Sequence, residues 1–509
     1  MQNRVLNAKR NIAWGLIQKG LQIVMGFVLQ TAIIHWLGSV YLGLNTLFTS
    51  ILHVLTLTEL GFGEAMVFSM YKPLAEGDTD TICALLKLYK RFYILIGSIV
   101  AVLGLILIPF LPILITGSVP SDVNLTVLYL IYLSNTVISY FLFAYKESIL
   151  IASQRSDICS NLSTIKMILL YAAQIAAIAI FHNYLVFCIL IPVFTVVRNI
   201  GIKLAVDKMY PGFTCRGELS KDIIGDIKKR VIGLFTYKVC GVFRSSFDSI
   251  ILSAYLGLIE LAKYQNYMYL MTAVSSVTSI MTSGIIAGVG NSIVTESKKK
   301  NYEDFEKFQL IYLFFISWCT VCLYVLYQPF IELWVGKDLL LSNTIKAIFC
   351  SYFFVQHMGD ISYVYRQATG IWYEDRFRPV VEAVANLTLN ILLVRSIGMS
   401  GVLLSTVVCV VFINCLWGVK VLYKSYFDGF KVTRYYARML YFAAATALGC
   451  FATERICGLI PTKGIPFIAV SLILCLIVPN LINAVLLKPL PEYGSALAFI
   501  RQRFLRRKR

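Results

Sequence analysis

Charged residues are scarce in this sequence, and acidic residues are scarcer than basic ones. Of 509 residues only 14% are charged, with 27 Asp and Glu against 46 Lys and Arg. Apolar and aromatic residues make up 58%, and the mean hydropathy is +0.75. A soluble domain could not bury so much apolar surface, whereas a lipid bilayer accepts it. The composition therefore excludes an ordinary soluble protein, and the net charge of +19 does not indicate nucleic-acid binding.

Motifs of enzymes and metal proteins are also missing. On one side of the membrane the connections between apolar segments are short, which leaves no room for a loop domain that carries catalytic groups. The sequence has no Walker motif, glycine-rich nucleotide loop or metal triad. Cys319 and Cys322 form a C-x-x-C pair without a second pair or a His nearby, which favours packing over metal or redox chemistry. We therefore expect no enzyme, no metal site and no cofactor.

Long apolar segments occupy almost the whole chain. A helix that spans a bilayer needs about 20 mainly apolar residues, and about fourteen such stretches are present. We predict transmembrane helices at residues 11–34, 41–69, 92–116, 123–150, 162–181, 184–206, 231–256, 262–294, 308–329, 344–370, 379–395, 400–422, 437–455 and 464–487. Arg4, Lys9 and Arg10 precede a long first segment without a small-residue cleavage site, so this segment is expected to remain as an anchor.

The basic residues sort by side of the membrane. Taken in order, every second connection between the predicted helices is rich in Lys and Arg, whereas the intervening connections hold few. Basic loops stay in the cytoplasm. The pattern therefore predicts an all-α polytopic membrane protein with an even number of helices and with both termini in the cytoplasm.

The two halves of the chain resemble each other. A shift of 219 residues places Lys19 on Lys238 and Trp36-Leu-Gly38 near Tyr255-Leu-Gly257. A shift of 220 or 221 residues aligns a second region, Ala144-Tyr-Lys146 with Val364-Tyr-Arg366 and Gln154-Arg155 with Asp375-Arg376. The offset is six helices, so both repeats have the same orientation. We expect two six-helix lobes related by a pseudo-twofold axis along the membrane normal, with a substrate site between them near the midplane.

The repeat predicts how the chain divides. We expect an N-terminal lobe at 1–206, a cytoplasmic amphipathic linker at 207–230, a C-terminal lobe at 231–425, two extra helices at 426–487 and a basic cytoplasmic tail at 488–509. The linker alternates apolar and charged residues in the manner of a helix that lies on the membrane surface. The tail could bind anionic lipid head groups, or it could serve only as an orientation signal.

Polar stripes run along the first two predicted helices of each half. Polar side chains avoid lipid, so such stripes are typical of a water-filled cleft. Tight helix packing produces similar stripes of small residues, and this alternative stays open. The stripes comprise Asn11, Gly15, Gln18, Gln22 and Gly26; Asn45, Thr49, His53, Thr56, Gly63 and Glu64; Tyr237, Lys238, Gly241, Arg244, Ser245 and Asp248; and Gln265, Thr272, Ser276, Ser279 and Ser283.

Basic residues within the predicted helices are harder to explain by packing. A charge deep in a helix costs about 2.5–3.5 kcal/mol on insertion scales. We expect Lys19, Lys238 and Arg244 to line a cationic cavity that receives an anion. Asp248 lies four residues after Arg244 on the same face, so a structural ion pair between them is the alternative.

Titratable residues offer candidates for ion coupling. Glu59 and Glu64 could carry coupling protons, or they could neutralise Lys19. His53 and His357 could also carry protons, or they could be interior histidines with satisfied hydrogen bonds.

A charged stretch after the helix at 344–370 is a candidate gate. Asp375, Arg376 and Arg378 follow this helix at its cytoplasmic end, and Arg366 lies inside it. These four residues could hold a cytoplasmic gate closed through salt bridges. The stretch could equally cap a tight turn.

Several short motifs recur in a characteristic order along the predicted helices. They are Tyr41-Leu-Gly-Leu-Asn-Thr-Leu-Phe48, Glu59-Leu-Gly-Phe-Gly63, Tyr71-Lys-Pro-Leu-Ala75, Asp248-Ser-Ile-Ile251, Asn266-Tyr267 and Trp372-Tyr-Glu-Asp-Arg-Phe-Arg-Pro379, followed by Glu382 and Asn386. In their order and places these segments resemble Wzx-type flippases of O-antigen and polysaccharide units, within the multidrug/oligosaccharidyl-lipid/polysaccharide exporter superfamily. The similarity runs from about residue 5 to residue 425.

The resemblance implies a function. Such flippases have two six-helix lobes around a central cavity that is often cationic. By alternating access they move an undecaprenyl-pyrophosphate-linked oligosaccharide to the outer leaflet of the bacterial inner membrane, for O-antigen, capsule or exopolysaccharide synthesis. A polysaccharide polymerase, a chain-length regulator and coupling H⁺ or Na⁺ are the implied partners besides the lipid-linked glycan. The related lipid II flippases add two C-terminal helices, as we expect here.

A drug or cation antiporter of the same superfamily is the alternative. It would share the fold but would favour a cavity dominated by carboxylates. Lys19, Lys238 and Arg244 argue against it.

Overall fold

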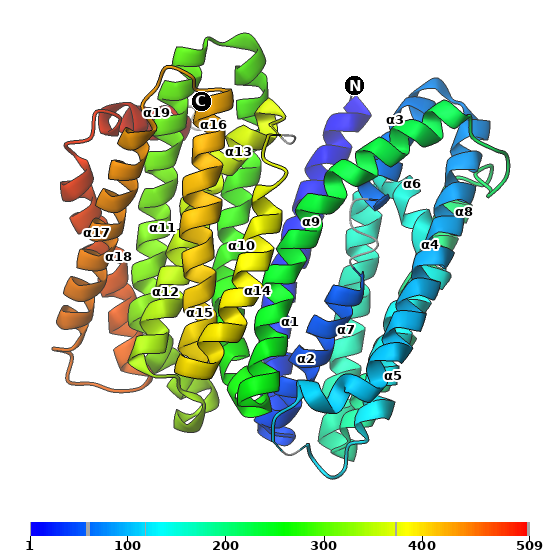
Figure 1. Ribbon diagram of the computed structural model, residues 1–509, viewed down its shortest axis with the longest axis horizontal. Coiled ribbons are helices and arrows are strands. Elements are labelled where there is room, and N and C mark those ends of the chain that lie inside the picture. The colour runs from blue at the N-terminus through cyan, green and yellow to red at the C-terminus, as the bar shows by residue number, and fades with distance from the viewer. Residues whose placement is uncertain (1, 57–61, 118, 372–373, 506–509) are drawn as a thin grey trace. The chain divides into compact units, whose positions relative to one another are not determined.

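The computed structural model describes residues 2–56, 62–117, 119–371 and 374–505. Side chains at 2–9, 12, 222, 229–230, 232–241, 243–245, 287, 500 and 503–505 are outside the described set. All regular secondary structure in the described residues is helical (Figure 1). Nine helices among them are long and apolar enough to cross a membrane, or ten if one bent pair counts as a single span. The predicted all-α polytopic membrane fold is confirmed.

Contacts group the chain into two compact units, residues 1–262 and 263–509. In the first unit α1 packs against α7, α5 and α7 pack against α8, and α9 packs against α2 and α3. Its helices are α1 (Gln2–Trp36), α2 (Ser39–Leu55), α3 (Phe62–Glu76), α4 (Thr79–Leu107), η2 (Ile108–Leu114), α5 (Leu125–Phe141), η3 (Ala144–Lys146), α6 (Glu147–Ala152), α7 (Ser156–Phe181), α8 (Tyr184–Met209) and α9 (Lys221–Leu256).

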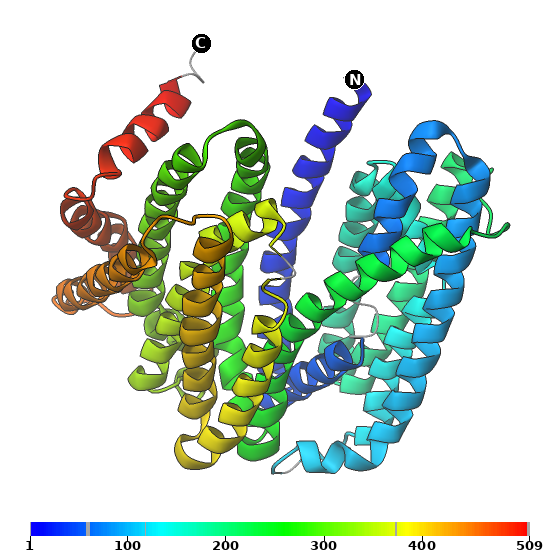
Figure 2. The ribbon, with the colours of Figure 1, turned by 45° about the horizontal axis from the view of Figure 1, so that its top comes forward.

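The second unit is built around α11, which packs against α12, α17 and α18. Most of α10 belongs to this unit. Its helices are α10 (Leu258–Thr295), α11 (Lys298–Val335), η4 (Lys337–Leu339), α12 (Asn343–Met358), α13 (Asp360–Thr369), α14 (Arg378–Ile397), α15 (Met399–Cys409), the π-helix η5 (Val410–Trp417), α16 (Gly418–Ser425), α17 (Val432–Cys457), α18 (Ile465–Leu487) and α19 (Tyr493–Leu505). In Figure 2 these elements run from green to red.

Each of the fourteen predicted segments has a helical counterpart, but three are interrupted. The segment at 41–69 comprises α2 and α3, with residues 57–61 outside the described set. The segment at 123–150 bends by 49° between α5 and α6, where Phe143 has a φ of 58°. The segment at 344–370 is broken at Gly359. Hydropathy could not reveal the bend, because residues 141–146 are almost entirely apolar.

The lobe boundaries stay predictions. The sequence suggested a separate linker helix at 207–230, whereas α9 runs continuously from Lys221 through the predicted helix at 231–256. An N-terminal cap explains where it begins, because the side chain of Ser220 accepts a hydrogen bond from the amide of Ile223. The surface segment and the following span are thus one element.

Gly38 and Gly257 have the same backbone conformation at matching places in the repeat. Gly38 follows α1 with φ 108° and ψ 164°, and Gly257 follows α9 with φ 88° and ψ 177°. Only glycine adopts this region without strain. A Cβ on Gly257 would also lie 2.7 Å from the carbonyl oxygen of Thr116. The Leu-Gly pairs that revealed the repeat are therefore helix-ending signals.

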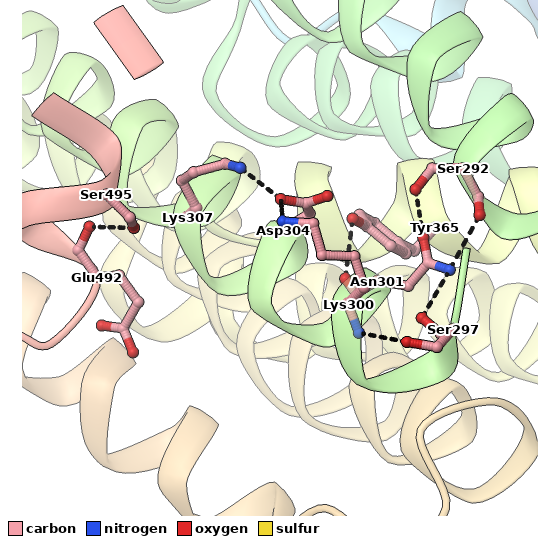
Figure 3. A network of polar contacts seen from close by, with 9 residues as sticks. All are labelled: Ser292, Ser297, Lys300, Asn301, Asp304, Lys307, Tyr365, Glu492 and Ser495. Atoms are coloured by element: carbon pink, nitrogen blue, oxygen red, sulfur yellow. Dashed lines mark hydrogen bonds and ion pairs between the residues drawn. The ribbon is translucent and has the colours of Figure 1, made fainter. Parts of the chain in front are cut away.

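The turn between α10 and α11 is fixed by one buried amide (Figure 3). Asn301 has no exposed surface, and its Nδ2 donates to the Ser292 carbonyl at 3.1 Å. The Ser292 hydroxyl donates to Asn301 Oδ1 at 2.8 Å. Tyr365 on α13 donates its hydroxyl to the Asn301 carbonyl at 3.2 Å. These bonds hold α10, α11 and α13 together at one end of the second unit.

Candidate functional site

The first unit contains a partly open cavity of about 780 Å³. Its walls come from α3, α4, α5, η3, α6 and α8, together with the residue that follows α2. Two carboxylates and one guanidinium line it. The lining residues are Thr56, Gly63, Glu64, Val67, Phe68, Tyr71, Tyr89, Tyr93, Asn135, Thr136, Ser139, Tyr140, Ala144, Glu147, Ser148, Ile151 and Arg198. We call this the larger chamber.

A second cavity of about 380 Å³, the smaller chamber, lies beside the first and shares Asn135, Ser139 and Arg198 with it. It is formed by α1, α5, α7 and α8. Its described lining includes two cations and no carboxylate. The lining residues are Gln18, Gln22, Asn135, Ser139, Ser163, Lys166, Met167, Leu170, Tyr171, Thr195, Arg198 and Asn199.

Arg198 connects the two chambers. One guanidinium nitrogen donates to both carboxylate oxygens of Glu147, at 2.8 and 3.0 Å, and Nε donates to the Ser163 hydroxyl at 2.9 Å. Thr195 and Asn199 lie on the same face of α8 as Arg198, because residues three and four apart are neighbours on a helix. Asn199 is 1% exposed, so this face points into the unit. The side chain is thereby held in one orientation by α6 and α7.

Lys166 lacks such a counterion. Its ammonium donates to the Thr195 hydroxyl at 3.2 Å, and Thr195 donates in turn to Asn135 at 2.7 Å. Among the residues that the structure describes, no carboxylate forms an ion pair with Lys166. The positive charge of Lys166 is therefore available to an anion that enters the smaller chamber, where Arg198 adds a second cation.

The structure places the predicted cation-lining residues in different settings. Lys19 on α1 is exposed, and Gln18 and Gln22 from its stripe line the smaller chamber instead. Lys238 and Arg244 belong to α9, but their side chains lie outside the described residues. Their proposed contact with an anion stays a prediction.

The predicted coupling residues are also dispersed. Glu64 lines the larger chamber, and Asp248 on α9 is 1% exposed. His53 is an exposed side chain on α2. Glu59 lies outside the described residues.

The four candidate gate residues divide into a cluster and one neighbour. Arg378 forms a two-bond pair with Asp375, with both N–O distances at 2.7 Å, and Arg366 approaches the same carboxylate at 3.9 Å. Arg378 also pairs with Glu382 at 3.3 Å. Arg376 is only half-buried, and its guanidinium lies over the Phe377 ring. Arg366, Asp375, Arg378 and Glu382 form the cluster that we call the buried ion cluster.

The sequence pattern did not predict a role for Lys166, Arg198 and Glu147. All three lie inside predicted spans, at 162–181, 184–206 and 123–150, outside the polar stripes. Their spacing in the sequence does contain a signal. Ser163 lies three residues before Lys166, which places both side chains on one face of a helix. Thr195 lies three residues before Arg198 and four before Asn199, which places these polar side chains on one face of the next helix. Among the described residues no group of three or more His, Cys, Asp or Glu could hold a metal ion.

Comparisons with known proteins address the fold. No family model and no curated protein sequence matches the chain. The structure of the lipid II flippase MurJ in an inward closed conformation matches with a TM-score of 0.72 and 16% identity, covering 94% of this chain and 99% of MurJ. An inward-facing multidrug resistance MATE transporter of the MOP superfamily matches with a TM-score of 0.59 and 14% identity, over 78% and 95%. The MATE transporter VcmN of Vibrio cholerae matches at 0.56 and 15%, over 84% and 100%.

The chain has the fold of these transporters. At these low identities the similarity shows the fold alone.

Proposed function

We propose that the protein is a flippase that moves an undecaprenyl-pyrophosphate-linked oligosaccharide from the inner to the outer leaflet by alternating access. The observation that carries this proposal is the smaller chamber, which presents Lys166 and Arg198 inside a fold similar to that of MurJ. Lys and Arg are the side chains that bind phosphate oxygens. The amides and hydroxyls around them can replace the hydration of sugar groups.

The energetics favour outward movement of such a substrate. A sugar–pyrophosphate head group is polar and about doubly negative at neutral pH, so it cannot cross hydrocarbon unaided. An inside-negative membrane potential drives negative charge outward, by about 2.3 kcal/mol per charge for 100 mV. Binding to cations opposes release of the head group. Partial neutralisation of Arg198 by Glu147 weakens this opposition and leaves Lys166 as the principal counterion.

The remaining predicted residues fit this proposal as follows. Lys19, Lys238 and Arg244 are proposed to contact the pyrophosphate at another stage of movement. The buried ion cluster is proposed to close the cytoplasmic side, with both chain termini in the cytoplasm of a bacterium and the protein in its inner membrane. A polysaccharide polymerase and a chain-length regulator would act on the exported unit.

Reconstitution in vesicles tests the proposal. A fluorescent polyprenyl-diphosphate-linked disaccharide is placed in one leaflet, and its arrival in the other is followed with a membrane-impermeant quencher. We expect Lys166→Gln to slow flipping by about 10–100-fold, since a charge-assisted hydrogen bond contributes about 1.5–3 kcal/mol. Lys203→Gln is the matched control, because Lys203 lies on α8, which packs against the α7 helix of Lys166, but sits over the Phe143 ring at 4.6 Å and lines neither chamber.

A second variant tests the sequence-derived cations. Replacing Lys19, Lys238 and Arg244 together with Gln should abolish flipping while the protein remains in the membrane. If the triple variant flips the glycan at the wild-type rate, Lys19, Lys238 and Arg244 do not bind the pyrophosphate. If Lys166→Gln flips it at the wild-type rate, the smaller chamber is not the substrate site.

A drug or cation antiporter is the second candidate, because Glu64 and Glu147 line the larger chamber. If the protein is an antiporter, the wild type should export a cationic dye from the same vesicles, and Glu147→Gln should abolish this export. Dye efflux without glycan flipping would favour the antiporter.

A further inference from the structure

A histidine and an aspartate meet at the interruption between α12 and α13. His357 lies in the last turn of α12 and is 6% exposed, and Asp360 is the first residue of α13. Their side chains are 2.7 Å apart, between Nδ1 of His357 and Oδ2 of Asp360. The other imidazole nitrogen, Nε2, lies 2.9 Å from the Ser275 hydroxyl of α10. Both ring nitrogens therefore have a hydrogen-bond partner.

Two further hydroxyls complete the network. Tyr312 on α11 donates to the same Oδ2 of Asp360 at 2.5 Å and lies 3.3 Å from His357 Nδ1. The hydroxyl of Thr278 lies 3.4 Å from the same nitrogen and donates to the Ser275 carbonyl at 2.8 Å. Residues from four helices, α10, α11, α12 and α13, thus converge on one imidazole and one carboxylate.

This arrangement accepts either protonation state of the imidazole. With His357 neutral, Nδ1–H donates to Asp360 and Nε2 accepts from the Ser275 hydroxyl. With His357 protonated, Nε2–H donates to the Ser275 oxygen, and only the hydroxyl hydrogen has to rotate. A proton can therefore enter or leave without loss of a hydrogen bond.

Other titratable and charged groups surround this pair. Tyr312 and Cys319 face it from α11, Cys415 from η5 and Tyr435 from α17, whose hydroxyl donates to the Met358 carbonyl at 3.4 Å. Arg366 is the cation on α13, and it lies beside Asp375 in the buried ion cluster. Among the described side chains of α10, the hydroxyls of Ser275 and Thr278 contact the pair.

The pair also lies where the backbone departs from regular helix. Gly359 separates α12 from α13, and a Cβ there would lie 3.3 Å from the Cys415 sulfur of the π-helix η5. Single stretches of π-helix occur frequently at functional sites. The side chain of Asp360 is 29% exposed whereas that of His357 is 7% exposed, so the carboxylate is the more accessible member of the pair.

We propose that His357 and Asp360 form the proton-binding site of the second unit, and that binding of one proton there couples a pH gradient to transport. The coupling part of this proposal rests on the proposed transport function, whereas proton binding does not. The charge of the pair changes from −1 to 0 on protonation. Because α12 and α13 meet at this pair, the change acts on both helices.

Proton binding is measured first, on the full-length protein in detergent with ¹⁵N-labelled histidine. The chain has 4 His, so His357→Gln assigns the His357 signals by their loss. We expect a reversible titration of these signals, with a midpoint that moves in Asp360→Asn, where the carboxylate beside Nδ1 is removed. His35→Gln is the control, since His35 is exposed on α1 and should leave the His357 titration unchanged. Ring signals that stay constant from about pH 4 to pH 9, or a midpoint that Asp360→Asn does not move, would overturn the proposal.

Coupling is measured next in vesicles, as the ratio of the transport rates with and without a pH gradient of one unit. With one coupled proton, a gradient of one pH unit changes the equilibrium ratio of transported substrate by up to about tenfold. We expect this ratio to exceed one for the wild type and for His35→Gln, and to fall to one for His357→Gln and Asp360→Asn. If both variants keep the wild-type ratio, the coupling proposal is wrong. If the wild type does not flip the glycan while the His357 titration is present, the proposed function fails and the proton site stands.

Discussion

The two units differ in how their interior basic side chains are paired with carboxylates. In the first unit Lys166 lines a cavity without a carboxylate partner among the described residues, and Arg198 is held at the junction of two chambers. In the second unit the interior cations have counterions. Arg378 pairs with Asp375 and Glu382; Arg438 bonds Glu306 and Glu492; and Lys346 bonds Glu454 at 2.9 Å.

The difference suggests a division of roles. A buried pair that is broken leaves an uncompensated charge, so paired charges hold helices in fixed positions. A cation that lines a cavity without a carboxylate partner can instead bind an anionic ligand. We therefore assign substrate binding to the first unit, and structural support with proton binding to the second.

The largest expected effect follows from removing Asp375, one of the two carboxylates of the buried ion cluster. Asp375→Ala leaves Arg378, which is 2% exposed, without its two-bond partner. We expect a loss of about 3–5 kcal/mol in the free energy of unfolding, measured by denaturant or thermal unfolding in detergent. Glu76→Ala, which breaks the exposed pair with Lys72, is the control and should have little effect. An equally small effect of both variants would show that the second unit does not depend on its paired charges.

The next largest loss of stability is expected at Gly418, whose backbone lies close to Arg366 of the buried ion cluster. A Cβ on Gly418 would lie 1.8 Å from Nη1 of Arg366, so Gly418→Ala must displace the guanidinium. Overpacking of this kind costs about 1–3 kcal/mol. Gly225→Ala has open space around the new Cβ and serves as the control. If Gly418→Ala unfolds at the wild-type temperature, Arg366 is not held as described.

The pair between Lys346 and Glu454 should be less sensitive. Lys346 is 4% exposed and lies over the Tyr324 ring at 4.0 Å, but the side chain of Glu454 is 46% exposed. After Lys346→Met the carboxylate can turn to water, so we expect a loss of about 1–2 kcal/mol, below that of Asp375→Ala. The ranking of the two variants by unfolding temperature checks this, and a reversed order would contradict it.

The smallest effect is expected at the exposed pair between Lys298 and Asp428. The hydrogen bond and the charge of Lys298 lower the pKa of Asp428. The pair therefore contributes stability above the ordinary carboxyl pKa, and this contribution is lost as the pH falls through the lowered value. Lys298→Ala should return the pKa of Asp428 toward its ordinary range in an NMR titration, without a resolvable change in unfolding temperature. An unchanged pKa would show that the pair does not form in solution.

Much of the fold follows from hydropathy and charge pattern alone. Each of the fourteen predicted segments has a helical counterpart because its apolar residues favour a membrane-embedded helix, and Leu-Gly pairs mark helix ends in both repeats. The break at Phe143 was not predictable, since an apolar residue with positive φ leaves no mark in composition. The positions of Lys and Arg in the sequence predicted helices with basic side chains, but not which of these side chains have counterions. Pairing depends on tertiary contacts, as between Glu147 and Arg198, which are 51 residues apart in the sequence.

The central claim is that the uncompensated charge of Lys166 binds pyrophosphate. The most direct measurement is the equilibrium binding of polyprenyl pyrophosphate to the purified full-length protein, compared with Lys166→Gln and with the Lys203→Gln control. We predict that the dissociation constant rises about 10–100-fold in Lys166→Gln and stays at the wild-type value in Lys203→Gln. Equal affinity of Lys166→Gln and the wild type would contradict the account.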